Sequence, residues 1–222
     1  MIDLQDMVIK SLGAYDNQRD RSQQIEIGPS SIGGCARRVY HDLKQTPKTN
    51  DTEKLAAILG TFIHSGLDKA IRRNDPFEEN FLIEIEVAHG DLKGHCDLFI
   101  KDIGLVVDWK TTTKSGMRYF GSEQQRFQIH TYGWLLEKNG YEVKEVALVG
   151  IPRDGKMQDI QVMREKYNPD IAAQGIAWLD GIKQIVATNS PAPSPEKYAK
   201  WCTNYCPYFD RTGEIGCPSM TK

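Results

Sequence analysis

Two carboxylates and one lysine lie close together in this sequence and have the side-chain types of a metal site. Asp97 sits in the segment GHCDLFI, and Asp108 and Lys110 close the apolar run GLVVDWK. Carboxylate oxygens are the ligands that hard divalent cations prefer in proteins. A lysine beside such a cation can orient water and stabilise developing negative charge. The group therefore has the equipment for metal-assisted phosphodiester hydrolysis.

The segments that carry these residues predict a β-hairpin. Residues 92–100 and 105–111 are rich in strand-forming side chains. Residues 101–104 between them carry Asp and Gly turn signals. The hairpin would bring the two acidic segments side by side.

Strand alternation predicts which of these side chains meet. Asp108 and Lys110 point to one face of their strand and Trp109 to the other, and Asp97 can reach them across the hairpin. Solvent-facing strand charges are the alternative interpretation of such a pattern. However, Asp108 and Lys110 end a buried type of apolar run, where an unpaired charge is costly, so a second charge or a metal must compensate.

An amphipathic helix is predicted upstream, over residues 51–74. Its inward stripe recurs at three- and four-residue steps and comprises Ala57, Gly60, His64, Leu67 and Ile71. A histidine on such a stripe is either a hydrogen-bonded core residue or a metal ligand, and spacing does not decide between the two.

A second amphipathic helix is predicted over residues 122–138. Gln125, Gln128, Tyr132 and Leu135 share one stripe of it. Gln128 and Tyr132 lie one turn apart. They either belong to the helix surface, with the tyrosine packed at its edge, or bond the lysine, the attacking water or a phosphate.

Four short motifs occur in order along the chain: GTFIH ending at His64, GHCD ending at Asp97, DWK at 108–110 and QIHTY at 128–132. Together they resemble the RecB-like branch of the PD-(D/E)XK nucleases. The resemblance includes SSIGGCARRVYHDL at 30–43 and the C-terminal cysteines, so it spans about Ser30 to Cys217. It implies a restriction-endonuclease-like α/β fold, in which a mixed sheet is flanked by helices.

The resemblance also implies roles for the site residues. Mg²⁺ or Mn²⁺ is expected to bind the side chains of His64, Asp97 and Asp108 and the backbone carbonyl of Trp109. Glu86, on the preceding strand, is a further candidate ligand. Lys110 is expected to orient the attacking water, and Gln128 and Tyr132 to complete the catalytic group.

Cysteine spacing narrows the resemblance to the iron-sulfur nucleases. That group includes the CRISPR-associated adaptation nuclease, the AddB nuclease domain and related viral single-domain exonucleases. One cysteine precedes the nuclease core and three follow it: Cys35, Cys202, Cys206 and Cys217. In that group a one-plus-three set binds a 4Fe-4S cluster. The resemblance therefore implies an iron-sulfur lobe formed jointly by residues 30–48 and 196–222.

The last three cysteines read C-x3-C-x10-C, which departs from the tight trio usual in that group. A four-cysteine zinc site would use the same thiolates, so zinc is the alternative occupant. The fifth cysteine, Cys96, is expected to pack as a small apolar residue. An odd count of five without an apolar N-terminal signal segment favours a reducing cytoplasm, which for a viral chain is the host cytoplasm.

Length and composition predict one nuclease domain over residues 1–222. Of the 222 residues, 40% are hydrophobic and 26% charged, which is enough for a substantial core. No apolar run reaches the roughly 18 residues of a membrane span, so no membrane partner is expected. The remaining segments read as a polar segment to residue 28, strands at 81–88, 142–152 and 158–166, a helix at 169–188 and a Pro-rich bridge at 190–195.

The net charge of −2 predicts that any contact with DNA depends on local basic side chains. Bound divalent cations would add positive charge where the scissile phosphate sits, so the overall charge does not exclude a nuclease. Arg37, Lys114 and Arg118 are the predicted DNA contacts. Arg72 and Arg73 are better explained as solvated charges at a helix end.

With the resemblance, these residues predict a Mg²⁺- or Mn²⁺-dependent deoxyribonuclease, most simply an exonuclease acting on DNA ends or single strands. The alternative is a DNA-binding or adaptor module of recombination or CRISPR adaptation that keeps the fold and the cluster without catalysis, because a fold alone does not prove catalysis. Recombination or CRISPR adaptation proteins are the expected partners besides DNA.

Overall fold

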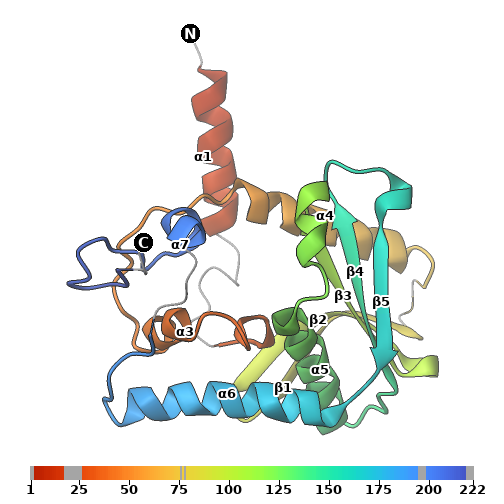
Figure 1. The fold of residues 1–222 in the computed structure, drawn as a ribbon. Coiled ribbons are helices and arrows are strands. Elements are labelled where there is room, and N and C mark those ends of the chain that lie inside the picture. Colours follow the sequence, from red (N-terminus) through yellow and green to blue (C-terminus); the bar gives the residue numbers. More distant parts are fainter. Residues whose placement is uncertain (1–2, 18–26, 76, 78, 195–198, 219–222) are drawn as a thin grey trace.

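One five-stranded sheet forms the centre of the molecule (Figure 1). The computed structural model describes residues 3–17, 27–75, 77, 79–194 and 199–218. The strands lie in the order β1-β2-β3-β4-β5, with only β3 and β4 parallel, so the sheet is mixed. Their bounds are Phe81–His89 (β1), Leu92–Ile100 (β2), Leu105–Thr112 (β3), Glu145–Pro152 (β4) and Gln161–Lys166 (β5).

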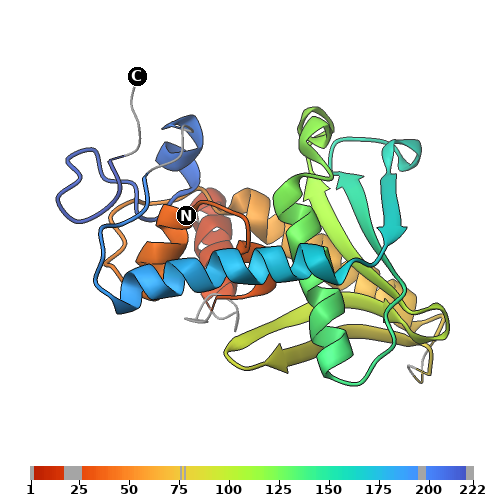
Figure 2. The same ribbon diagram turned by 60° about the horizontal axis from the view of Figure 1, so that its bottom comes forward.

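Helices cover both faces of this sheet. α4 (Leu55–Arg72) packs on one face, and α5 (Glu123–Lys138) connects the parallel strands β3 and β4 on the other. A parallel pair needs a crossover of this kind. α6 (Pro169–Ala187) crosses α5 as an outer layer (Figure 2). The predicted mixed α/β fold with flanking helices is confirmed.

Two apolar clusters lie on the two faces of the sheet. The larger joins the sheet to α5 and α6 and includes Val106 and Leu135. The smaller lies beneath α4 and includes Trp109. Asp108 and Lys110 follow Val106 at two-residue steps and share its face, opposite Trp109, as strand alternation predicted.

Several elements begin later than predicted. α4 begins at Leu55 rather than residue 51, because the backbone N–H of Glu53 donates to the carbonyl of Asn204 and holds the preceding segment against the C-terminal region. β4 begins at Glu145 rather than 142, because the backbone N–H of Lys144 bonds to the loop after β2. A 3-10 turn occupies the predicted start of β5.

Helix α1 (Leu4–Asn17) was not predicted; the sequence indicated only a polar N-terminal segment. The Asp3 carboxylate accepts two backbone N–H groups of the first turn, at 3.0 and 3.1 Å, and caps the helix. The Tyr15 ring packs against α4, and the rest of the helix projects from the body (Figure 1). Residues 1–2 and 18–26 of the predicted segment lie outside the described residues.

An early and a late segment of the chain lie on the same side of the sheet. α3 (Ala36–Leu43) and α7 (Ala199–Tyr205) are both on the side of the molecule away from β5 (Figures 1 and 2). α7 was not predicted, and the Pro-rich bridge before it is described to residue 194 without helix or strand. No helix in the described part of the chain combines the length and the apolar character that a membrane span requires.

Candidate active site

The candidate site begins where β2 and β3 separate. Their ladder runs from Ile100↔Leu105 to Leu98↔Val107 and is not continued at the next residue. There the buried Asp97 carboxylate replaces a backbone partner, because its Oδ2 accepts the backbone N–H of Trp109 at 2.7 Å. This bond ties the Asp97 side chain to the strand that carries Asp108 and Lys110.

A polar triangle stands on the α5 side of β3. Lys110 Nζ lies 2.7 Å from Asp108 Oδ2 and donates to Gln128 Oε1 at 2.6 Å. Gln128 Nε2 donates to Asp108 Oδ1 at 2.9 Å. Burial raises the pKa of Asp108 to about 6, although the Lys110 ammonium opposes that shift. Gln128 therefore fixes the relative positions of the acid and the lysine.

His64 joins this group from α4. Its Nδ1 lies 3.4 Å from Asp97 Oδ1, the carboxylate oxygen not used by the backbone of Trp109. Burial disfavours the charged imidazole, but the hydrogen bond to Asp97 and the carboxylates of Asp97 and Asp108 outweigh it and raise the pKa of His64. α4 comes close enough for this contact because Gly60, one turn earlier, lies directly over Thr111.

Glu84, which sequence reasoning missed, completes the acidic group. One ligand atom each of His64, Glu84 and Asp97 lies within 4.8 Å of the others. Glu84 has a positive φ of 51°, and the β1–β2 ladder is interrupted at Glu84 and Asp97, between Ile83↔Leu98 and Ile85↔Cys96, without a change of register. The positive φ turns the Glu84 side chain away from its direction in a regular strand, and no local sequence signal announces it.

Glu86, the predicted further ligand, points elsewhere. Its Oε2 lies 3.1 Å from Lys93 Nζ and 3.5 Å from His95 Nε2, and its side chain is 54% exposed. The structure places Glu84 in the acidic group in its stead. In a regular strand Glu84 and Glu86 would point to the same face, and the positive φ at Glu84 is what distinguishes their directions.

Asp68 is the second residue that sequence reasoning missed. It follows His64 by one turn of α4, and its Oδ1 is buried without a hydrogen-bond partner among the described residues. Burial, together with the charges of Glu84 and Asp97, raises the pKa of Asp68 to about 6. The four-residue spacing between His64 and Asp68 indicates in the sequence that both side chains lie on one face of the helix.

Two cavities reach the site. The larger has a volume of about 1460 Å³ and the smaller about 650 Å³. Arg38, His64, His95 and Lys110 line both of them, so the site lies where they meet. Tyr132 is buried and lines the smaller cavity with Gln128.

The predicted DNA contacts have different surroundings. Arg118 lines the larger cavity, with its guanidinium 4.9 Å from the centroid of the Tyr119 ring. Arg37 instead donates to the carbonyl of Pro193 at 3.0 Å. Lys114 Nζ lies 3.1 Å from a carboxylate oxygen of Asp159. Arg118 is therefore the one of the three that the structure brings to a cavity of the site.

Three of the four predicted thiolate ligands share a cavity. Cys35, Cys202 and Cys206 line the larger one, whereas Cys217 is buried and does not line it. Burial raises the pKa of Cys206, and the neighbouring Cys202 and Cys35 add to that effect. All five cysteines are free, and Cys96 is fully buried in the core as expected.

Hydrogen bonds join the two chain segments that carry these cysteines. The Asn50 side chain donates to the carbonyls of Thr203 and Cys206, both at 2.9 Å. The Tyr208 hydroxyl donates to an Asp42 carboxylate oxygen at 2.7 Å. These hydrogen bonds hold the segment after α3 and α3 itself against the segment around α7.

Comparisons with known proteins assign the fold and the family. The crystal structure of SSO0001 aligns with a TM-score of 0.61 and 18% identity, over 100% of this chain and 99% of that chain. The alkaline exonuclease LHK-Exo from Laribacter hongkongensis aligns with a TM-score of 0.51 and 10% identity, over 76% of this chain and 91% of that one. The comparison with curated protein sequences finds no match.

The family model described as the PD-(D/E)XK nuclease superfamily matches residues 69–211. The matched range holds Asp97, Asp108, Lys110 and Gln128, and His64 lies just before it. Because the match covers more than half of the chain, the protein belongs to the PD-(D/E)XK nuclease superfamily.

Proposed function

We propose that this chain is a metal-dependent deoxyribonuclease, an exonuclease that hydrolyses phosphodiester bonds and acts on DNA ends or single strands. The observation that carries the proposal is the meeting of His64, Glu84 and Asp97 with the Asp108–Lys110 pair on a nuclease fold. The exonuclease preference is supported by the similarity of the fold to LHK-Exo, an alkaline exonuclease.

The donor set fits Mg²⁺ or Mn²⁺. The ligands we propose are the side chains of His64, Asp97 and Asp108 and the carbonyl of Trp109, with Glu84 in place of Glu86. Carboxylate oxygens dominate this set, as hard cations prefer, and the buried Asp108 carboxylate, which is paired with Lys110, would gain a second partner for its charge. When bound, the cation would polarise the phosphate and lower the pKa of the attacking water.

The protein side chains orient the reaction. Two contacts hold the Lys110 ammonium, at 2.7 Å from Asp108 and 2.6 Å from Gln128. So held, Lys110 positions the attacking water and stabilises the negative charge that develops on the phosphate, without reorganisation during the reaction. Tyr132, in the wall of the smaller cavity, contacts the phosphate or the nucleotide beside it.

The cysteine site is proposed to hold a 4Fe-4S cluster, with zinc as the alternative occupant. Three thiols that line one cavity suit either group, and Cys217 would supply the fourth thiolate. The proposed lobe comprises residues 30–48 and 196–222 of a single domain over 1–222; residues 196–198 and 219–222 lie outside the described residues. Iron, sulfide and zinc assays on anaerobically purified protein test it, with Cys35→Ser expected to lose the group and Cys96→Ser to keep it.

The biological setting is proposed from the same resemblance. Iron-sulfur nucleases of the CRISPR-adaptation and AddB groups, some of them viral, act on DNA together with recombination or CRISPR adaptation proteins, and we propose partners of that kind. Five free cysteines are consistent with a reducing cytoplasm, including that of a host cell if the chain is viral.

Circular DNA tests the exonuclease preference. Linear and circular single strands of one sequence, each incubated with the protein and Mn²⁺, differ only in having ends. Degradation of the linear strand alone supports an exonuclease, and cutting of the circle contradicts it. Binding to both strands without cutting of either would instead favour the adaptor alternative.

A further inference from the structure

Two aromatic side chains on α7 are exposed beside the site. Trp201 and Tyr205 lie one turn apart, with 59% and 41% of their surfaces accessible to solvent. Their ring centroids are 5.2 Å apart at an interplanar angle of 38°. Neither ring belongs to an apolar core cluster, so core packing does not account for them.

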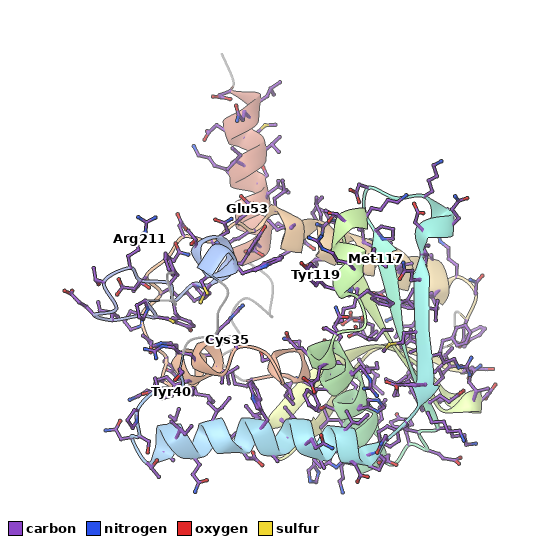
Figure 3. All side chains as sticks on the ribbon, in the orientation of Figure 1. Cys35, Tyr40, Glu53, Met117, Tyr119 and Arg211 are labelled. Carbon is purple, nitrogen blue, oxygen red and sulfur yellow. The ribbon has the colours of Figure 1, made fainter. Side chains whose placement is uncertain are left out.

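Both rings line the larger cavity, which His64 and Lys110 also line. Tyr119, 60% exposed, lines it from the sheet side with Arg118 against its ring. Figure 3 shows Tyr119 on the sheet side of the cavity and Cys35 on the side of α3. At about 1460 Å³ the cavity exceeds the roughly 300–1,000 Å³ of small-molecule sites, which suits an extended ligand.

We propose that Trp201 and Tyr205 form a stacking platform for unpaired DNA bases and guide a single strand through the larger cavity to Lys110. The platform rests on the proposed nuclease function and specifies its substrate. Exposed rings stack on the faces of bases of any sequence, and an arginine against an aromatic ring adds to such a surface. Bases within a duplex are stacked on each other, so the platform favours single strands.

Binding measured without catalysis tests the platform. Fluorescence anisotropy in EDTA compares labelled dT20 with an abasic strand of equal phosphate number, so that charge is constant and only the bases differ. We expect wild type to prefer dT20 by roughly 5- to 100-fold, the contribution of a stacked base. The double variant Trp201→Ala/Tyr205→Ala should lose this preference, and Trp201→Phe/Tyr205→Phe should keep most of it.

Phe77→Ala is the matched control. Phe77 is 82% exposed but lines neither cavity, so its removal should leave the preference unchanged. Intrinsic fluorescence gives a second measurement that does not depend on the alanine variants: dT20 should quench wild type, and Trp201→Phe should lose most of that quenching.

The platform is overturned if the double alanine variant retains the wild-type preference, if wild type binds both strands equally, or if Trp201→Phe is quenched like wild type. Protein partners would then be the better explanation of the exposed rings. Failure of the nuclease proposal would look different. In that case wild type would prefer dT20 in EDTA, as the platform predicts, but would not cut it when Mn²⁺ is added.

Discussion

Gln128 holds Lys110 in place. Its Oε1 accepts the Lys110 ammonium at 2.6 Å while its Nε2 donates to Asp108 at 2.9 Å, so one amide sets the distance between the acid and the lysine. An amide is suited to this position because it accepts and donates at once, which neither a carboxylate nor an ammonium can do at neutral pH.

Replacement of Gln128 should lower the rate of the chemical step. A hydrogen bond to a charged group contributes about 1.5–3 kcal/mol, so Gln128→Ala should reduce single-turnover cleavage roughly 10- to 100-fold. DNA affinity should change little, because the amide acts through Lys110. Gln184→Ala, on the exposed face of α6, is the control and should cleave like wild type. A Gln128→Ala variant with wild-type rate would contradict the role.

The two glutamates of β1 should differ in metal binding. Glu84→Gln removes a carboxylate from the acidic group. Loss of one residue that supports a metal site typically lowers metal affinity by roughly 10-fold or more, so we expect a reduction of this size in Mn²⁺ affinity measured by calorimetry. Glu86→Gln changes a carboxylate paired with Lys93 outside the group and should leave the affinity unaltered. The reverse order of the two variants would restore the sequence-based assignment of Glu86.

Two glycines of α4 should respond in opposite directions to alanine. A Cβ at Gly60 would lie 2.9 Å from Thr111 Oγ1, so Gly60→Ala should cost about 1–3 kcal/mol of unfolding free energy and displace His64. A Cβ at Gly66 meets nothing within 4 Å, so Gly66→Ala should stabilise the helix by about 0.5–1 kcal/mol. Denaturant titration checks both, and equal effects would refute the close approach of α4 to β3.

Asp68 should make the metal-free protein sensitive to pH. Its pKa is raised to about 6, because burial and the charges of Glu84 and Asp97 disfavour the carboxylate, so the folded state binds this proton more tightly than the unfolded state. The resulting stability is fully present below about pH 4 and is lost as the pH rises through 6. In EDTA, Asp68→Asn should therefore gain stability relative to wild type between pH 4 and 6.

The neighbouring carboxylate provides the control for that measurement. In a Glu84→Gln background one of the charges that raise the pKa of Asp68 is absent, so the pH-dependent difference should shrink. A difference between Asp68→Asn and wild type that stays constant from pH 4 to 6 would show that Asp68 does not titrate in this range.

The sequence predicted the parts of the site that depend on local periodicity. Strand alternation placed Asp108 and Lys110 on one face, opposite Trp109, and the helical repeat turned Gln128 toward them. These relationships follow from the two-residue and 3.6-residue periods of the backbone. The same periods predicted the mixed sheet with its covering helices.

The parts that were missed depend on contacts between distant segments. Glu84 lies in the acidic group at a local break of the β1–β2 ladder, and no glycine announces its positive φ. α7 is held by the Asn50 side chain, about 150 residues earlier in the sequence. Its seven residues are too few to show a helical period in the sequence. α1 carried one usable signal, the capping carboxylate of Asp3, but lacks a clear apolar stripe.

Cleavage of labelled single-stranded DNA by anaerobically purified protein, with Mn²⁺ titrated against EDTA, tests the central claim most directly. Wild type should cut only with the metal, and Lys110→Ala should lose at least 100-fold in rate while binding DNA normally in EDTA. Lys144→Ala, an exposed lysine paired with Glu142, should cut like wild type. Absence of cutting by wild type at every metal concentration, or equal cutting by Lys110→Ala, would contradict the account.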